Sequence, residues 1–133
     1  NRPDAGAVVH AHPAAASAFA AMDKEIDVRL TAEAWQVLGW PVKAPYALMG
    51  TDALAVSVGR AARQGNAIIM ENHGVVTVGA TLLQAFERME LLEAAAKMTW
   101  IAESMGPARP LSAERLLEIE KKYGGGSRNN RPL

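Results

Sequence analysis

The stretch 67-AIIMENHGVVTVG-79 decides the fold, because it predicts two buried strands joined by a tight turn. The apolar runs Ala67–Met70 and Val75–Val78 are rich in β-branched residues, as strands are. The residues between them, Glu-Asn-His-Gly, include turn formers. We therefore expect a strand-turn-strand unit that carries His73 in its turn, at a strand end.

The chain holds three histidines, and the other two lie in 8-VVHAHP-13. This stretch predicts another buried strand, which ends at Pro13 because proline cannot donate to a ladder. Side chains alternate along a strand, so His10 and His12 point to one face. A third imidazole, from His73, would complete a three-nitrogen site with an open fourth position, as in catalytic metal sites. The alternative is three unrelated histidines, each hydrogen-bonded to the backbone.

The composition of the chain excludes several classes of partner and of site. The chain has 133 residues, enough for one domain, and its formal net charge is zero, so no nucleic acid or anionic membrane is expected as partner. It has no cysteine, which excludes disulfides and thiolate metal sites. No apolar run is long enough to span a bilayer, and a cytoplasmic location is the expectation.

Helical patterns alternate with the strands, which predicts the α/β class, a sheet covered by helices. A short strand is expected at Ile26–Leu30, and a loop or edge strand at Gly39–Pro45. The expected helices, with Thr31, Thr81 and Ser112 as N-caps, cover residues 14–22, 31–38, 51–64, 81–105 and 112–123.

The helix that follows Thr81 has the clearest pattern. Thr81-Leu-Leu-Gln84 fits a capping box, and Glu93 with Lys97 forms an i,i+4 pair expected on the solvent side. An apolar stripe with steps of three or four residues is expected to face the core or a neighbouring subunit; it comprises Leu82, Phe86, Met89, Leu92, Ala96 and Trp100.

The chain starts at Asn1, very close to a predicted core strand, so we expect it to be a piece of a longer protein whose missing part lies upstream. Residues 1–123 are expected to form the domain. Residues 124–133 are rich in glycine and polar residues, and are expected to be a flexible tail.

Three motifs in this order resemble the class II aldolase/adducin family: 8-VVHAHP-13, 44-APY-46 with Gly50-Thr51, and 71-ENHGVV-76. The segment 85-AFERMELLE-93 is similar to the family's helix after the third histidine. The resemblance runs from about Asp4 to Tyr123. It implies a three-layer αβα sandwich with a central mixed or antiparallel sheet.

The resemblance also implies a zinc ion held by His10, His12 and His73, although Mn²⁺, Co²⁺ or Fe²⁺ also suit three imidazoles. It further implies a symmetric homotetramer with active sites between subunits, acting on small phosphorylated sugars. The reactions of the family share carbanion chemistry beside a carbonyl, and a bound cation stabilises the charge that develops there.

Other residues match the family less completely. The family's acid/base glutamate and its phosphate-binding loops usually lie upstream of the His-x-His pair, and Glu71 does not match that glutamate. Glu71 is either a turn residue or a support for the ligands. Asn72 is expected to be a turn residue that tolerates left-handed geometry, and Tyr46 to be structural.

Tyr123 resembles the C-terminal tyrosine that certain family aldolases use as a proton donor from a mobile tail. The alternative is an ordinary exposed or helix-packed tyrosine. Some family aldolases also place a tyrosine near the positions of Leu30 and Thr31, and this chain has none there.

The first hypothesis is a zinc-dependent lyase that cleaves a phosphorylated ketose by retro-aldol chemistry into dihydroxyacetone phosphate and an aldehyde. Alternatives with the same metal are a pentulose-5-phosphate 4-epimerase, a dehydratase or a decarboxylase. A non-catalytic adducin-like interaction module is the alternative from another class, and it has no need of three metal ligands.

Overall fold

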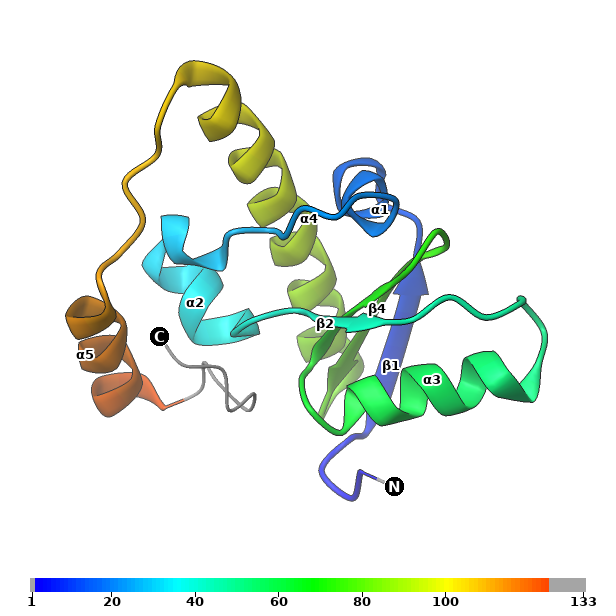
Figure 1. Cartoon of the computed structure of the whole chain (residues 1–133). Helices are drawn as coiled ribbons and strands as arrows, with labels where there is room; N and C mark the ends of the chain where they lie inside the picture. The colour runs from blue at the N-terminus through cyan, green and yellow to red at the C-terminus, as the bar shows by residue number, and fades with distance from the viewer. Residues whose placement is uncertain (1, 125–133) are drawn as a thin grey trace.

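The structure, a computed structural model, describes residues 2–124. Four strands in this part form one mixed sheet in the order β1-β4-β3-β2 (Figure 1). The central β4 (Gly74–Gly79) is antiparallel to both β1 (Ala7–Ala11) and β3 (Ala67–Met70), and β2 (Val42–Ala44) runs parallel to β3. The predicted strand-turn-strand unit is therefore confirmed and forms the middle of the sheet.

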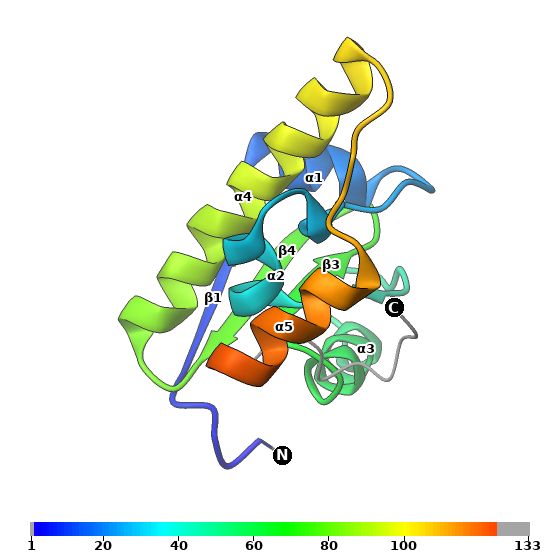
Figure 2. The same cartoon turned by 90° about the vertical axis from the view of Figure 1, so that its left-hand side faces the viewer.

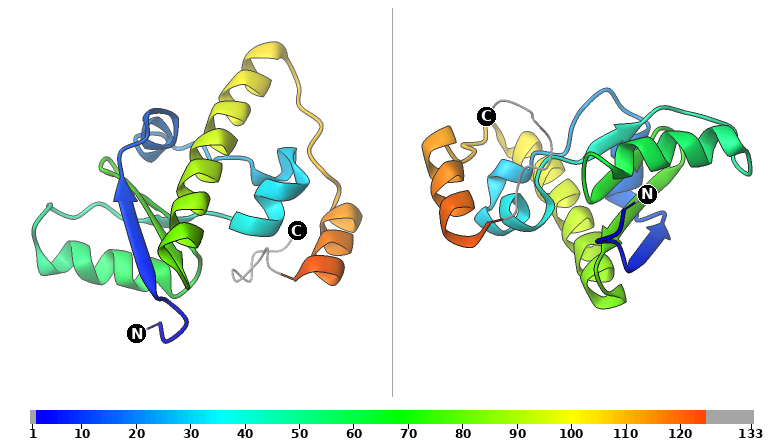
Figure 3. Two further views of the ribbon diagram at one scale, coloured as in Figure 1. Left: turned by 180° about the vertical axis from the view of Figure 1, so that it is seen from behind. Right: turned by 90° about the horizontal axis from the view of Figure 1, so that it is seen from below.

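Helices cover both faces of the sheet, which gives the predicted three-layer αβα architecture. One face carries α3 (Asp52–Ala62), and the opposite face carries α1 (Ala14–Ala20), α2 (Ala32–Leu38) and α4 (Leu82–Met105). The last helix, α5 (Ala113–Tyr123), packs against the outer side of α2 (Figures 2 and 3).

Alternation along the strands divides the core in two. Ile69 and Val75 point into the larger cluster, between the sheet and the helices α1, α2 and α4, where Trp35 is fully buried. Ile68 and Val76 point into the smaller cluster under α3. Every residue of β3 and β4 is buried, as expected for strands covered on both faces.

The predicted caps Thr31, Thr81 and Ser112 are present, and Thr51 caps α3 in the same way. The side-chain oxygen of each accepts a hydrogen bond from the backbone N–H three residues later. At α4, Gln84 completes the motif through Oε1, which accepts from the N–H of Ala80 rather than from Thr81. No helix among residues 2–124 is long and apolar enough to cross a membrane.

Two expectations about strands are wrong. Ile26–Leu30 is not a strand; Val28–Leu30 forms a single 3-10 turn (η1), in which Asp27 accepts from the N–H of Arg29. The β1 strand is only partly buried, because within residues 2–124 it lies at an edge of the sheet and the described helices leave one of its faces uncovered. Val8, on that face, is 61% exposed.

The stripe predicted on α4 faces the core only in the middle of the helix. Met89, Leu92 and Ala96 are buried, but the ends of the stripe, Leu82 and Trp100, are 67% and 64% exposed. A helix of 24 residues is ~36 Å long, whereas a strand of six residues spans only ~20 Å. The two ends of α4 therefore extend beyond the sheet.

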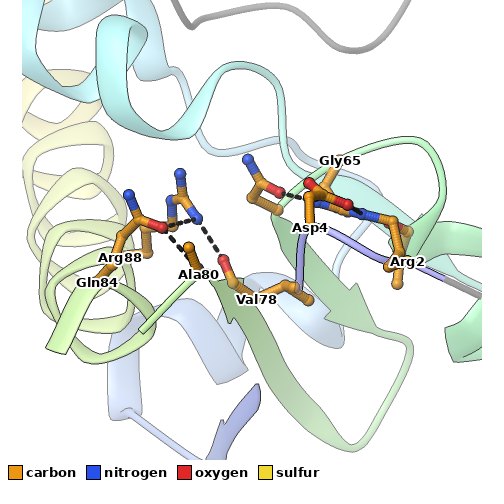
Figure 4. A network of polar contacts seen from close by, with 9 residues as sticks. Arg2, Asp4, Gly65, Val78, Ala80, Gln84 and Arg88 are labelled. Atoms are coloured by element: carbon orange, nitrogen blue, oxygen red, sulfur yellow. Dashed lines mark hydrogen bonds and ion pairs between the residues drawn. The ribbon is translucent and has the colours of Figure 1, made fainter. Parts of the chain in front are cut away.

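Arg2 ties the N-terminal segment to the end of α3 (Figure 4). Its guanidinium donates to the carbonyl oxygens of Ala62 and Gly65 and to Oδ1 of Asn66, 2.8 Å away. Asp4 accepts two hydrogen bonds from the same guanidinium group, at 2.8 and 2.7 Å. These hydrogen bonds raise the pKa of Arg2 above its ordinary value. These contacts fix the chain just before β1.

A second arginine joins α4 to the far end of β4 (Figure 4). Arg88 donates to the carbonyl oxygen of Val78 and to Oε1 of Gln84. Gln84 in turn holds the N–H of Ala80 at 2.8 Å. The sharp connection between β4 and α4 is therefore stabilised by side chains of the helix that it leads into.

We predict that Leu92→Ala lowers the free energy of unfolding by about 3 kcal/mol, because the fully buried side chain leaves a cavity between α4 and the sheet. Leu83→Ala, on the same helix but 65% exposed, should change it by less than about 0.5 kcal/mol. Urea denaturation of both variants checks this. Equal losses would contradict the assignment of the core face of α4.

Candidate metal centre

The antiparallel pairing of β1 with β4 brings the three histidines together. In this register His10 lies opposite Val76 and Ala11 opposite Val75, so the C-terminal end of β1 lies beside the start of β4. His12 follows β1 directly, and His73 directly precedes β4. Two sequence segments far apart along the chain thus meet at one end of the sheet.

The three imidazoles form a compact cluster. Ring centroids are 4.7 Å apart for His10 and His12, 5.1 Å for His10 and His73, and 5.4 Å for His12 and His73. One ring nitrogen from each residue lies within 4.8 Å of the other two. Two nitrogens that share one tetrahedral zinc at ~2.1 Å are ~3.4 Å apart, so small side-chain rotations suffice to bind an ion.

A backbone hydrogen bond sets the orientation of His10. Its Nδ1 lies 2.9 Å from the carbonyl oxygen of Val75, which can only accept, so Nδ1 carries the proton. Nε2 is then left with its lone pair free for a ligand. A hydrogen bond from the second ring nitrogen to a carbonyl is the usual companion of a histidine that binds a metal.

The ring of His12 lies against Gly74, and only glycine leaves room for it. A Cβ atom at position 74 would lie 2.6 Å from Cδ2 of His12 and 2.8 Å from the carbonyl oxygen of Ala11. The glycine that follows His73 in the sequence therefore allows the other ligand strand to approach closely.

The site is open on one side. His10 and His12 are exposed and His73 is half-buried, so solvent or a further ligand can reach the ring nitrogens. Within residues 2–124, these three residues form the only group of three or more histidine or carboxylate side chains that lie close enough together to hold one ion. The donor set is three neutral nitrogens with accessible space beside them, which fits a catalytic rather than a closed structural metal site.

The turn that carries His73 is fixed from two directions. The N–H of Glu71 donates to the carbonyl oxygen of Ala44 in β2 at 3.0 Å, and the N–H of Asn72 donates to that of Ala20 in α1 at 2.9 Å. Asn72 has a φ of 54°, and among residues 2–124 it is the only non-glycine residue with a positive φ. The interpretation of Asn72 as a left-handed turn residue is therefore confirmed.

Glu71 supports the neighbouring loop. Its Oε2 accepts from the backbone N–H of Tyr46 at 2.8 Å, which joins the turn before His73 to the segment after β2. The side chain of Tyr46 is 60% exposed. Of the two roles left open for Glu71, the structure shows that of a turn residue, whose side chain also holds the loop after β2.

Tyr123 is the last residue of α5, and its side chain is 62% exposed beside Lys122. The main contacts of α5 are with α2, on the side of the molecule away from β1 (Figures 1 and 3). The described contacts within one chain do not bring Tyr123 to the histidines. Its role as a proton donor stays a prediction, and the predicted tail lies outside the described residues except for Gly124.

The contacts of Glu93 differ from those that the sequence predicts. The predicted pair with Lys97 is present at 3.4 Å, but the side chain of Glu93 is only 16% exposed and does not lie on the solvent side. Its two carboxylate oxygens accept from the N–H groups of Ala15 and Ala16, at the start of α1. A signal was present in Pro13, an N-cap with no side-chain acceptor, which leaves these N–H groups to be satisfied from elsewhere.

The chain is similar to several known proteins. A family model of the class II aldolase and adducin N-terminal domain matches residues 1–100. The L-fuculose phosphate aldolase of Methanococcus maripaludis (strain C5) is 32% identical over 106 residues, which cover 80% of this chain and 57% of the relative. The 3-oxo-tetronate 4-phosphate decarboxylase of Escherichia coli K12 is 31% identical over 123 residues, with coverages of 90% and 58%.

A solved structure of an L-fuculose 1-phosphate aldolase superimposes with a TM-score of 0.80 and 29% identity, over 92% of this chain and 57% of that one. The chain thus spans just over half the length of the curated relatives that it matches.

We predict that Asn72→Gly changes the free energy of unfolding by less than about 0.5 kcal/mol, because glycine adopts positive φ freely. Asn72→Val should cost about 1–2 kcal/mol, since a β-branched residue is strained at a φ of 54°. Thermal denaturation of the two variants checks this. A valine variant as stable as the glycine variant would contradict the turn geometry.

Proposed function

Because the chain belongs to the class II aldolase and adducin family, we propose that it binds a divalent metal ion through His10, His12 and His73. These are the three histidines of the chain, and nitrogens from all of them lie within 4.8 Å of one another. This convergence is the single observation that carries the proposal. Zinc is the first choice of metal, and Mn²⁺, Co²⁺ and Fe²⁺ are alternatives.

The ligand set suits catalysis beside a carbonyl. When bound, a divalent cation supplies Lewis acidity that stabilises negative charge as it develops on substrate oxygens. Three neutral imidazoles do not reduce the charge of the ion, as carboxylates would. The hydrogen bond from Nδ1 of His10 to the carbonyl oxygen of Val75 orients that ring and leaves Nε2 as the nitrogen that would bind the ion.

The proposed reaction is retro-aldol cleavage of a small phosphorylated ketose into dihydroxyacetone phosphate and an aldehyde. The proposal follows from the match to L-fuculose phosphate aldolases. Phosphorylated sugars are substrates found inside cells, so a cytoplasmic location belongs to the same proposal.

The proposal includes a homotetramer with sites between subunits, in which Tyr123 donates a proton in a neighbouring site. Two features support this arrangement: the exposure of Tyr123 and its place on α5, on the far side of α2 from the histidines of its own chain.

A decarboxylase of the same family is the second candidate. The specific observation in its favour is the 31% identity to the 3-oxo-tetronate 4-phosphate decarboxylase of E. coli K12 over 90% of this chain. Products distinguish the candidates: an aldolase releases a free aldehyde, a decarboxylase releases carbon dioxide, and a 4-epimerase releases only an epimer. An adducin-like module would release none of them and would need no metal.

Metal content is the first test. The purified chain should bind about one Zn²⁺ or Co²⁺ per molecule, and His73→Ala should weaken binding by more than ~100-fold, because it removes one of three ligands. Isothermal titration calorimetry measures both. Wild-type affinity in the His73 variant would rule out the shared site.

Turnover is the second test. With L-fuculose 1-phosphate as substrate, the zinc-loaded protein should release dihydroxyacetone phosphate, detected by a coupled reduction with NADH. A chelator should abolish the signal, and added zinc should restore it. Full activity in metal-free protein would exclude the proposed mechanism.

Gly74→Ala tests the packing of the site. Its new Cβ would displace the ring of His12, which lies 2.6 Å away, so the affinity for Co²⁺ should fall by about tenfold or more. Gly59→Ala is the matched control, because nothing lies within 4 Å of a Cβ at that position in α3. The control should bind Co²⁺ normally and gain up to about 1 kcal/mol of stability. Equal affinities in the two variants would contradict the close approach of His12 to Gly74.

A further inference from the structure

One short helix connects the two halves of the histidine cluster. α1 begins directly after His12-Pro13, and its last residue, Ala20, accepts a hydrogen bond from the N–H of Asn72 at 2.9 Å. Asn72 immediately precedes His73. A rigid α1 therefore sets the spacing between the segment that carries His12 and the turn that carries His73.

The start of α1 is held by a residue from another helix. Pro13, its N-cap, makes no side-chain cap hydrogen bond. Instead Oε1 of Glu93 accepts from the N–H of Ala15 at 3.1 Å, and Oε2 accepts from the N–H of Ala16 at 2.8 Å. A carboxylate in this place satisfies two unpaired donors and lies favourably in the field of the helix dipole.

Glu93 is itself firmly held. It lies in the middle of α4, one residue after Leu92, which is fully buried in the larger core cluster. Its own side chain is only 16% exposed, and Lys97 pairs with it from the solvent side at 3.4 Å. The anchor of α1 is thus a largely buried carboxylate on the longest helix of the domain.

We propose that Glu93 is a positioning residue of the metal centre. By capping α1 from α4, it holds His12 and the turn of His73 at the distance that a single ion requires. It does so without belonging to the group of side chains that could ligate the ion. This inference rests on the proposed function, since it assigns a supporting residue to the proposed metal site.

The effect on metal binding follows from the connections. Without the carboxylate, the N–H groups of Ala15 and Ala16 lose their acceptor, and the start of α1 can shift. Pro13 transmits such a shift to His12, whose ring has no spare room against Gly74. Metal sites lose affinity steeply when supporting contacts are removed, commonly by ~10–100-fold.

The test uses Co²⁺ titrations of the full chain, read by affinity and by the visible spectrum, which reports the coordination geometry. Glu93→Ala removes both acceptors. Glu93→Gln retains one acceptor oxygen and serves as the conservative variant. Lys97→Ala is the matched control for the ion pair, because it leaves both hydrogen bonds to α1 in place.

A second control separates positioning from general stability. Leu116→Ala creates a cavity where α5 packs on α2, since Leu116 is 1% exposed, and it should destabilise the fold without touching α1. Amide hydrogen exchange at Asn72 in the metal-free protein provides a readout that needs no metal, because that N–H bonds to Ala20.

The expected result is a loss of Co²⁺ affinity of about tenfold or more in Glu93→Ala, a smaller loss in Glu93→Gln and wild-type binding in both controls. Exchange at Asn72 should accelerate more in Glu93→Ala than in Leu116→Ala. If Glu93→Ala does not fold, Glu93→Gln provides the measurement.

Three outcomes would overturn the inference. Wild-type affinity in both Glu93 variants would overturn the role of Glu93 but not the proposed metal site. An equal loss in Leu116→Ala would show that the effect is one of stability. A wild-type chain that binds no Co²⁺ would overturn the proposed function, and the inference with it.

Discussion

The backbone pairing between β1 and β4 is the constraint on which the site depends. In an antiparallel pair, the end of one strand lies beside the start of the other. This pairing alone therefore brings His10 and His12 to the start of β4, beside His73. A shift by one residue would turn His10 to the opposite face of the sheet. Within residues 2–124, β1 pairs only with β4, in the register that places His10 opposite Val76.

Around this ladder, the rest of the domain restricts the movement of the histidines. The carbonyl of Val75 orients the ring of His10, Gly74 admits the ring of His12, and Ala20 with Ala44 holds the turn before His73. Each of these contacts comes from backbone or from the absence of a side chain. The geometry of the cluster is therefore set mainly by the path of the chain, which the proposed capping of α1 by the carboxylate of Glu93 would hold in place.

Much of this could be predicted from the sequence, because local patterns determine it. The runs 67–70 and 75–78, the threonine and serine caps and the His-x-His spacing are properties of short segments, and the structure contains them. Long-range features were not predictable in this way. The burial of Glu93 depends on a helix 77 residues away in the sequence, and the exposure of Leu82 and Trp100 depends on where the sheet ends beneath α4. The segment before Thr31 has strand-like composition, but the hydrogen bond from Arg29 N–H to Asp27 favours a 3-10 turn there.

The central claim is that all three imidazoles bind one ion. X-ray absorption spectroscopy of the zinc-loaded chain measures this directly, because it reports the ligand type, number and distance. The account predicts three imidazole nitrogens at ~2.0–2.1 Å, completed by one or two oxygen ligands. A shell of oxygen ligands alone, or one with fewer than three imidazoles per zinc, would contradict it.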